Sequence, residues 1–114
     1  MQELVEVVDS YNEYINNLSD GLVTVVEQLR NENFSEALIN IKNFSEGIVW
    51  LSQAGKLINQ NNGYASIDVN QITDFLLEIN EGLEMQDYVL VADIFEYELI
   101  PFCEAIEEAK VSVE

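Results

Sequence analysis

Apolar residues recur at alternating steps of three and four in four separate stretches of this chain. Such steps keep side chains on one face of an α-helix, which turns once every 3.6 residues. A mean step of about 3.5 is typical of helices that pack at about +20° in four-helix bundles. Additional apolar residues beside each row, such as Val5, Val26 and Phe75, widen the apolar face beyond that of a two-stranded coiled coil. The pattern therefore predicts an all-α fold.

Short polar breaks separate the four stretches. They place the expected helices at 3–30, 34–59, 68–84 and 88–111. Short connections between long helices favour antiparallel neighbours, so we expect an antiparallel four-helix bundle in one domain, 1–114. Its first hairpin covers 3–59, its middle loop 60–67 and its second hairpin 68–111.

Polar residues at the helix starts have the chemistry of N-caps. Asn33 is expected to cap the second helix, with Glu36 bonding back to it. Asp68 and Asp87 are the expected caps of the third and fourth helices.

The two hairpins resemble each other when the sequence is shifted by 54 positions. Leu18-Ser19-Asp20 then falls on Ile72-Thr73-Asp74, and Asn33-Phe34 falls on Asp87-Tyr88. The matching of the turns as well as the apolar spacing suggests duplication of one hairpin. Two unrelated hairpins that obey the same packing rule remain an equal alternative.

The charge of the chain is extreme for its size. Its 114 residues carry 22 acidic and 4 basic side chains, a formal net charge of −18. This field repels phosphate backbones and anionic membranes, so we expect no direct binding to nucleic acid or membrane. It attracts basic partners or divalent cations, although solubility alone also accounts for it. A hydrophobic content of 48% argues against disorder. The N-terminal residues are acidic, unlike those of a signal peptide, and this predicts a cytoplasmic protein.

Two residues of the last helix have particular consequences. Cys103 is the only cysteine and neighbours Phe102 on the apolar side, which predicts a buried, inert thiol. Pro101 is the only proline and lacks the N–H that a helix interior uses, so we expect the helix to kink or pause there.

The residue types of common catalytic and metal sites are missing. The sequence has no histidine, the commonest general base and transition-metal ligand, and one cysteine cannot form a thiolate zinc site. A calcium-loop start at Asp68 fails because Thr73 stands where the loop needs glycine. We therefore expect no enzyme, no catalytic residue, no metal site and no cofactor.

The fourth helix carries apolar residues on more than one face. A set off its main row forms the candidate interaction surface of a homodimer or partner complex: Val89, Leu90, Ile94, Tyr97 and Ile100. Trp50 on the second helix is a candidate anchor, because aromatic residues dominate interface hot spots. A core position is its simpler interpretation.

The segment from Asp87 to Pro101, with the sequence DYVLVADIFEYELIP, resembles a segment of uncharacterised small acidic helical proteins of Gram-positive bacteria. The resemblance is limited to these 15 residues, which lie in the last quarter of the chain. It brings no known activity with it.

Three functional hypotheses follow from these features. The leading one is a non-enzymatic adaptor or chaperone-like module that binds a basic or amphipathic segment of a partner protein. The second is a nucleic-acid mimic that inhibits a basic nucleic-acid-binding protein. The third is a carrier of divalent metal ions built on carboxylates.

Overall fold

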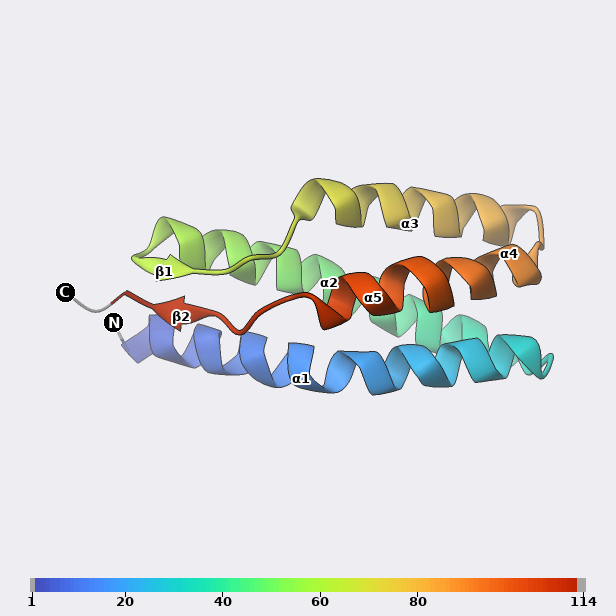
Figure 1. Cartoon of the computed structure of the whole chain (residues 1–114), viewed down its shortest axis with the longest axis horizontal. Coiled ribbons are helices and arrows are strands. Elements are labelled where there is room, and N and C mark those ends of the chain that lie inside the picture. The colour runs from blue at the N-terminus through green and yellow to red at the C-terminus, as the bar shows by residue number, and fades with distance from the viewer. Residues whose placement is uncertain (1, 113–114) are drawn as a thin grey trace.

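The computed structural model describes residues 2–112, which form four long helical segments and a two-stranded ribbon (Figure 1). The elements are α1 (Gln2–Arg30), α2 (Phe34–Gln60), β1 (Gly63–Tyr64), α3 (Val69–Glu84), α4 (Tyr88–Asp93), the π-helix η1 (Ile94–Leu99), α5 (Ile100–Glu104) and β2 (Lys110–Val111). Consecutive helices run antiparallel, and the molecule measures 51 × 22 × 19 Å. The predicted all-α bundle is confirmed. The predicted domain includes residues 1 and 113–114, which lie outside the described residues.

The bundle is organised around α1. This helix contacts α2 on one flank and α4, η1 and α5 on the other, and α3 packs on α4 and η1 (Figure 1). Aromatic rings connect the layers: Phe44 of α2 meets Phe95 of η1 edge-on at 5.5 Å. The apolar rows recognised in the first two helices are buried along almost their whole length. Burial of these faces drives the assembly, because free energy falls with apolar area removed from water.

The two hairpin turns have the same backbone structure at an offset of 54. Glu32 and Gln86 are both left-handed, with φ of 63° and 53°. The following amides of Asn33 and Asp87 each donate to a carbonyl five residues back, at 2.8 and 2.9 Å, as in a Schellman motif. Phe34 also stacks on Tyr88, its counterpart, at 4.2 Å. The turns therefore support the proposed duplication, whose common origin stays a hypothesis.

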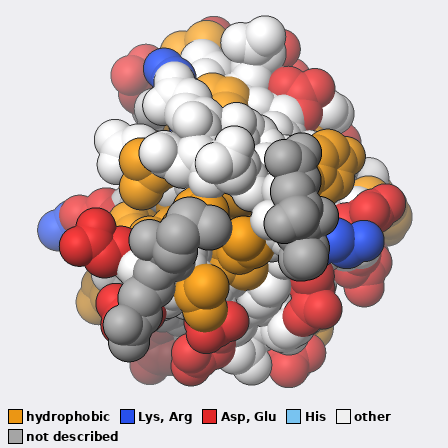
Figure 2. Space-filling view, turned by 90° about the vertical axis from the view of Figure 1, so that its left-hand side faces the viewer, with side chains coloured by type: hydrophobic (Ala, Val, Ile, Leu, Met, Phe, Trp, Pro, Cys, Tyr) orange, Lys and Arg blue, Asp and Glu red, His pale blue; other side chains and the backbone are white. Residues whose placement is uncertain are grey.

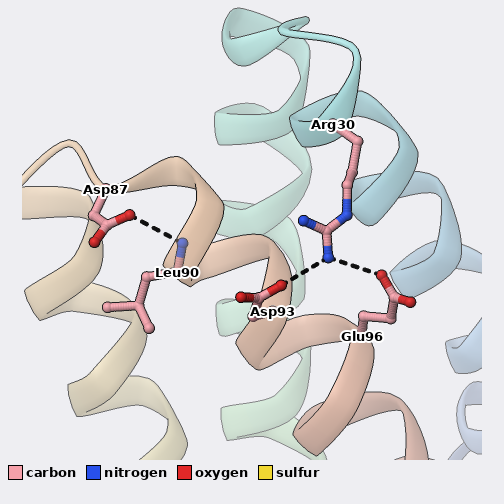
Figure 3. Close-up of polar contacts among 5 residues, drawn as sticks. All are labelled: Arg30, Asp87, Leu90, Asp93 and Glu96. Atoms are coloured by element: carbon pink, nitrogen blue, oxygen red, sulfur yellow. Dashed lines mark hydrogen bonds and ion pairs between the residues drawn. The ribbon is translucent and has the colours of Figure 1, made fainter.

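The helix caps agree with the sequence in two of three places. Asp68 accepts from the Gln71 amide at 3.1 Å, and Asp87 accepts from the Leu90 amide at 3.0 Å (Figure 3). The predicted cap at Asn33 is wrong, because its side chain makes no capping hydrogen bond. Its backbone carbonyl accepts from the Ala37 amide, and its φ and ψ of −84° and 61° are close to the −91° and 77° of Asp87, so the two positions differ in the side chain and not in the backbone.

An ion pair joins α1 to the fourth helical segment near these turns. The Arg30 guanidinium lies 2.9 Å from a carboxylate oxygen of Asp93 and 2.9 Å from one of Glu96 (Figure 3). Both carboxylates raise the pKa of Arg30 through these hydrogen bonds. The three side chains are partly exposed, so the pair adds little to stability.

The fourth helical segment accommodates Pro101 through a π turn. Over Ile94–Leu99 the helix widens, and the Ile100 amide donates to Phe95, five residues back. A wider turn before the proline avoids the crowding that its ring causes in a regular helix. A row of buried residues runs through this turn in steps of four, Val91, Phe95, Leu99 and Cys103, so Cys103 rather than Phe102 enters the core. The expected break in regularity at Pro101 is confirmed in this form.

The predicted end of the fourth helix is wrong. The helix stops at Glu104, and residues 110–111 form β2, which pairs antiparallel with β1 inside the predicted loop. The helical pattern extended too far because Ile106 and Ala109 continue the helical spacing, although the structure covers both side chains from a non-helical backbone, half-buried and buried respectively. The start of α3 and the end of α5 do not reach as far as the N-terminal end of α1 and the C-terminal end of α2. The extended segments that contain β1 and β2 cover this end of the first hairpin instead (Figure 1).

Two asparagine side chains hold these extended segments in place. Asn12 of α1 donates to the carbonyl of Ala109 at 3.1 Å and accepts from its amide at 2.6 Å. Asn59 of α2 does the same for Ala65, at 3.0 and 2.8 Å. A carboxamide offers one donor edge and one acceptor edge, so it can pair with a backbone as a neighbouring strand would. Gly55 lets this layer approach α2, because a Cβ there would lie 2.7 Å from Ile67 Cγ2.

Candidate functional site

A groove of about 670 Å³ lies between α1 and α2, on the flank of α1 that faces away from the fourth helical segment. Its lining mixes apolar side chains with neutral polar ones. The apolar members are Leu18, Leu22, Val25, Phe44, Tyr14 and Trp50. The neutral polar members are Ser10, Asn17, Thr24, Asn40 and Asn43. Glu13 is the single charged residue of this lining, in a chain with a net charge of −18.

Glycines shape the groove on both helices. A Cβ on Gly21 would meet nothing within 4 Å, so this residue faces open space in the groove. A Cβ on Gly47 would collide with the hydroxyl of Tyr14, so this glycine makes room for the tyrosine ring. The Tyr14 ring in turn meets Trp50 edge-on, with centroids 5.9 Å apart and planes at 66°. The pair forms an aromatic end wall, and burial raises the pKa of Tyr14.

The polar rim of the groove is held by local hydrogen bonds. Asn40 of α2 donates to Gln28 of α1 at 2.8 Å and closes the end opposite Trp50. Asn17 donates to the Glu13 carbonyl at 2.9 Å, within its own helix. These carboxamides and the hydroxyls of the rim are neutral hydrogen-bonding groups, suited to holding a polar edge of a ligand.

A row of carboxylates borders the groove on the outer side of α1. Its members are exposed and stand seven residues apart: Glu6, Glu13, Asp20 and Glu27. Seven residues are almost two helical turns, so the row runs along the helix axis with about 10.5 Å between neighbours. We call these four residues the acidic row. Acidic side chains also surround the ribbon end of the molecule, where few basic ones are seen (Figure 2).

The thiol of the chain lies away from the groove. The groove contains no thiol, and Cys103 is buried in the core, where desolvation raises its pKa to about 12. The predicted burial of this thiol is confirmed. Among residues 2–112, no three histidine, cysteine or acidic side chains come together in a way that could hold a metal ion.

The structure divides the predicted surface of the fourth helix. Val89 and Tyr97 are 68% and 67% exposed, Leu90 is also exposed, and Ile100 is half-buried. Ile94 was expected beside them, and this prediction is wrong, because Ile94 is only 2% exposed. The fourth helical segment packs against both α1 and α3, so most of its apolar side chains are covered by the rest of the chain.

Trp50 lies elsewhere, on α2, and is 39% exposed. It belongs to the α1–α2 groove, whose lining includes none of the five fourth-helix candidates. Val89 instead lines a small pocket of about 290 Å³ at the hairpin turns, together with Phe34 and Tyr88. The two parts of the predicted surface are therefore not brought together.

Sequence reasoning missed most of the groove and the whole acidic row. Two signals were present in the printed sequence. Small or neutral residues replace charges at Ser10, Asn17, Gly21 and Thr24, which share one side of α1 beside the apolar row. The carboxylates of the acidic row recur at a constant step of seven.

Residues 6–109 match the family described as Domain of unknown function (DUF8042). The match extends the earlier resemblance from the fourth helix to nearly the whole chain. It agrees with an uncharacterised family, while the bacterial group stays a prediction. No curated protein and no solved structure matches the chain. Among the described residues, no helix has both the length and the apolar character that crossing a membrane requires.

Proposed function

The chain belongs to this family, whose activity is not known, and we propose that it is a non-enzymatic interaction module that holds a helical segment of a partner protein in the α1–α2 groove. The observation that carries the proposal is the groove itself, with an exposed tryptophan at one end and a lining that contains one charged residue, Glu13, in a highly acidic chain. Cytoplasmic localisation fits the single buried cysteine and is part of the proposal.

A helix is the form of ligand that the groove favours. Two antiparallel helices leave a straight channel between them, and an amphipathic helix can lay its apolar face into such a channel. The floor supplies Leu18, Leu22 and Phe44, and Trp50 supplies an aromatic anchor of the kind found at interface hot spots. The distance along α1 from Ser10 to Thr24 is about 21 Å, which corresponds to about four turns of a bound helix.

The competing hypotheses find less support. A nucleic-acid mimic needs charges spaced like phosphates, which follow each other at about 3.4 Å of axis per strand. The members of the acidic row are about 10.5 Å apart, and Glu3 and Asp9 are the only further carboxylates of α1. The metal hypothesis has no candidate site among residues 2–112. A homodimer through Val89, Leu90 and Tyr97 stays open as a separate use of the fourth helix.

The groove can be tested with a synthetic amphipathic peptide of about three heptads, a length over which helices pack in register. The peptide carries leucine at two positions of each heptad, glutamine and alanine elsewhere, and no aromatic residue. Trp50 is the only tryptophan, so its emission reports directly on the groove. Binding is expected to move this emission to shorter wavelength, because the indole ring leaves water.

A matched pair of variants decides whether the groove is responsible. Gly21→Phe places a ring in the open space of the groove, and Val23→Phe places the same ring on an exposed position of the same helix. Gly21→Phe is expected to abolish binding while Val23→Phe retains it. Circular dichroism and thermal unfolding confirm that both variants are folded. Unchanged binding by folded Gly21→Phe would contradict the proposed site.

A further inference from the structure

We infer that the helix bound in the groove carries basic residues at steps of seven along one edge of its apolar face, placed to meet the acidic row. This inference rests on the proposed function, because it specifies the partner of the same groove. It follows from the different chemistry of the two rims and from the step of seven that relates four of the six carboxylates of α1.

The α1 rim is negative along its whole length. The acidic row extends over 21 residues from Glu6 to Glu27, which is about 32 Å of helix. All four side chains are exposed, and one of them, Glu13, also lines the groove. Arg30 follows the row on α1, but its guanidinium is engaged with Asp93 and Glu96 on the other flank. Within the described residues, no ion pair neutralises a member of the row.

The α2 rim is apolar at matching places. Ile39, Trp50 and Leu57 are exposed and stand 11 and 7 residues apart, which returns each to nearly the same side of the helix. Trp50 lines the groove, and Ile39 and Leu57 continue its rim towards either end of α2. A ligand between the rims therefore meets a row of carboxylates on α1, whereas on α2 it meets three exposed apolar side chains and the single carboxylate of Glu46 between Ile39 and Trp50.

A helix in this position needs a matching asymmetry. Its apolar face must cover the floor and the α2 rim, and basic side chains must lie on the edge towards α1. Because near-parallel helices have the same rise per residue, basic residues that face the acidic row recur every seven positions. Lysine or arginine at three successive heptads would meet three of the four carboxylates. The partner is thus a basic amphipathic helix of one defined pattern, not any cationic surface.

A second copy of the chain is the main alternative occupant. Lys42 and Lys56 are exposed on α2 and stand 14 residues apart, so another copy could present two basic residues at double the required step. Two copies would also bring together two net charges of −18, which repel each other at low salt. The charge balance therefore favours a different protein as the partner.

Three peptides of equal length test whether binding depends on the position of the basic residues or only on their number. The neutral peptide is the one described above. The edge peptide has lysine at one heptad position beside the apolar face, and the back peptide has the same lysines at the heptad position opposite that face. Trp50 emission and calorimetry measure the binding of each. We expect the edge peptide to bind about tenfold more tightly than the other two, a modest ratio because exposed ion pairs individually contribute little. The advantage should shrink at high salt.

Two quadruple variants distinguish the acidic row from general charge. Each replaces four exposed carboxylates by amides and so changes the formal net charge from −18 to −14. The row variant carries Glu6→Gln, Glu13→Gln, Asp20→Asn and Glu27→Gln. The control variant changes α3 instead and carries Asp74→Asn, Glu78→Gln, Glu81→Gln and Glu84→Gln. We expect only the row variant to lose the preference for the edge peptide.

The other outcomes each overturn a definite statement. Equal binding of all three peptides, still blocked by Gly21→Phe, would refute the basic pattern and leave the proposed groove intact. Equal losses in both quadruple variants would assign the preference to bulk charge and refute the inference. Absence of binding by every peptide would refute the groove as well. Sedimentation of the free chain as a dimer that Lys42→Gln disrupts would identify a second copy as the occupant.

Discussion

Replacing Asn12 by alanine tests whether the extended C-terminal segment is held by one side chain. The Asn12 carboxamide makes two hydrogen bonds to the backbone of Ala109, and Ala109 is buried against the first hairpin. The ribbon beyond it has only two residues in each strand, so it contributes little independent stability. Removal of the carboxamide should therefore loosen residues 105–112 before the helices.

The size of the effect follows from the bonds lost. Each hydrogen bond contributes about 0.5–1.5 kcal/mol net, so the pair accounts for about 1–3 kcal/mol. The amide and carbonyl of Ala109 would also lack a partner while the segment stays docked, which places the expected loss near the upper half of that range. Detachment of the segment limits the loss, because water then satisfies both groups. We expect a decrease of about 2 kcal/mol in the free energy of unfolding.

Urea denaturation measures the global loss, and amide hydrogen exchange locates it. A local loss of about 2 kcal/mol corresponds to roughly thirtyfold faster exchange at Ala109, since 1.4 kcal/mol is tenfold. Asn17→Ala on the same helix is the matched control, because Asn17 is exposed and donates only to its own helix at the Glu13 carbonyl. It should change stability by less than about 0.5 kcal/mol. The reasoning fails if Asn12→Ala behaves like Asn17→Ala and exchange at Ala109 is unchanged.

Four further predictions concern stability and reactivity. Gly21→Ala should stabilise the protein by about 1 kcal/mol through helix propensity. Gly47→Ala should destabilise it, because the new Cβ collides with the Tyr14 hydroxyl. Urea titrations in which the two variants change the free energy of unfolding in the same direction would contradict the packing described. Gln86→Gly should raise the melting temperature by relieving a left-handed backbone that costs about 1 kcal/mol or more in a side-chain-bearing residue, and an unchanged or lower value would argue against that strain. Burial raises the pKa of Cys103 from 9.0 to about 12, so its neutral thiol favours the folded state. The free energy of unfolding should therefore fall as pH rises from about 9 towards 12, and it should fall less steeply in Cys103→Ala. Thiol labelling at pH 8 that is faster than unfolding would refute the burial of Cys103. Sodium chloride should raise the melting temperature, because it screens the self-repulsion of a net charge of −18, and a decrease would show that attractive pairs dominate.

The helices were the most predictable part of the structure. Their apolar rows and turns are local features, and the observed bounds of α1, α2 and α3 lie within about one residue of the expected ones. Asp68 and Asp87 were recognised as caps for the same reason, since a cap acts on amides only a few residues away. The backbone at Asn33 is nearly the same as at Asp87, so the prediction for Asn33 failed only in the hydrogen bond of its side chain.

The candidate site was less predictable, and particular residues show why. Trp50 was recognised as a potential anchor, but its partner Tyr14 and the open position Gly21 lie on another helix, and the role of Gly47 depends on the Tyr14 side chain that it accommodates. Ile94 was misplaced because its burial depends on α1 and α3, which pack on the fourth segment together. Asn12 and Asn59 appeared as ordinary polar residues of the helices. In the structure Asn12 binds the backbone of Ala109, 97 residues later, and Asn59 binds that of Ala65 across the following loop.

The sequence by itself determined the helical class, the number and order of the helices, their acidic surface and the buried cysteine. Each of these depends on periodicity or composition, which a chain carries before it folds. The tertiary structure alone decided that residues 105–112 leave the helix for a ribbon, that Ile94 is covered, and that α1 and α2 leave an open groove beside a row of carboxylates. These outcomes depend on which faces meet and where one helix ends against another. Local propensity differs by too little between the alternatives to decide them without those contacts.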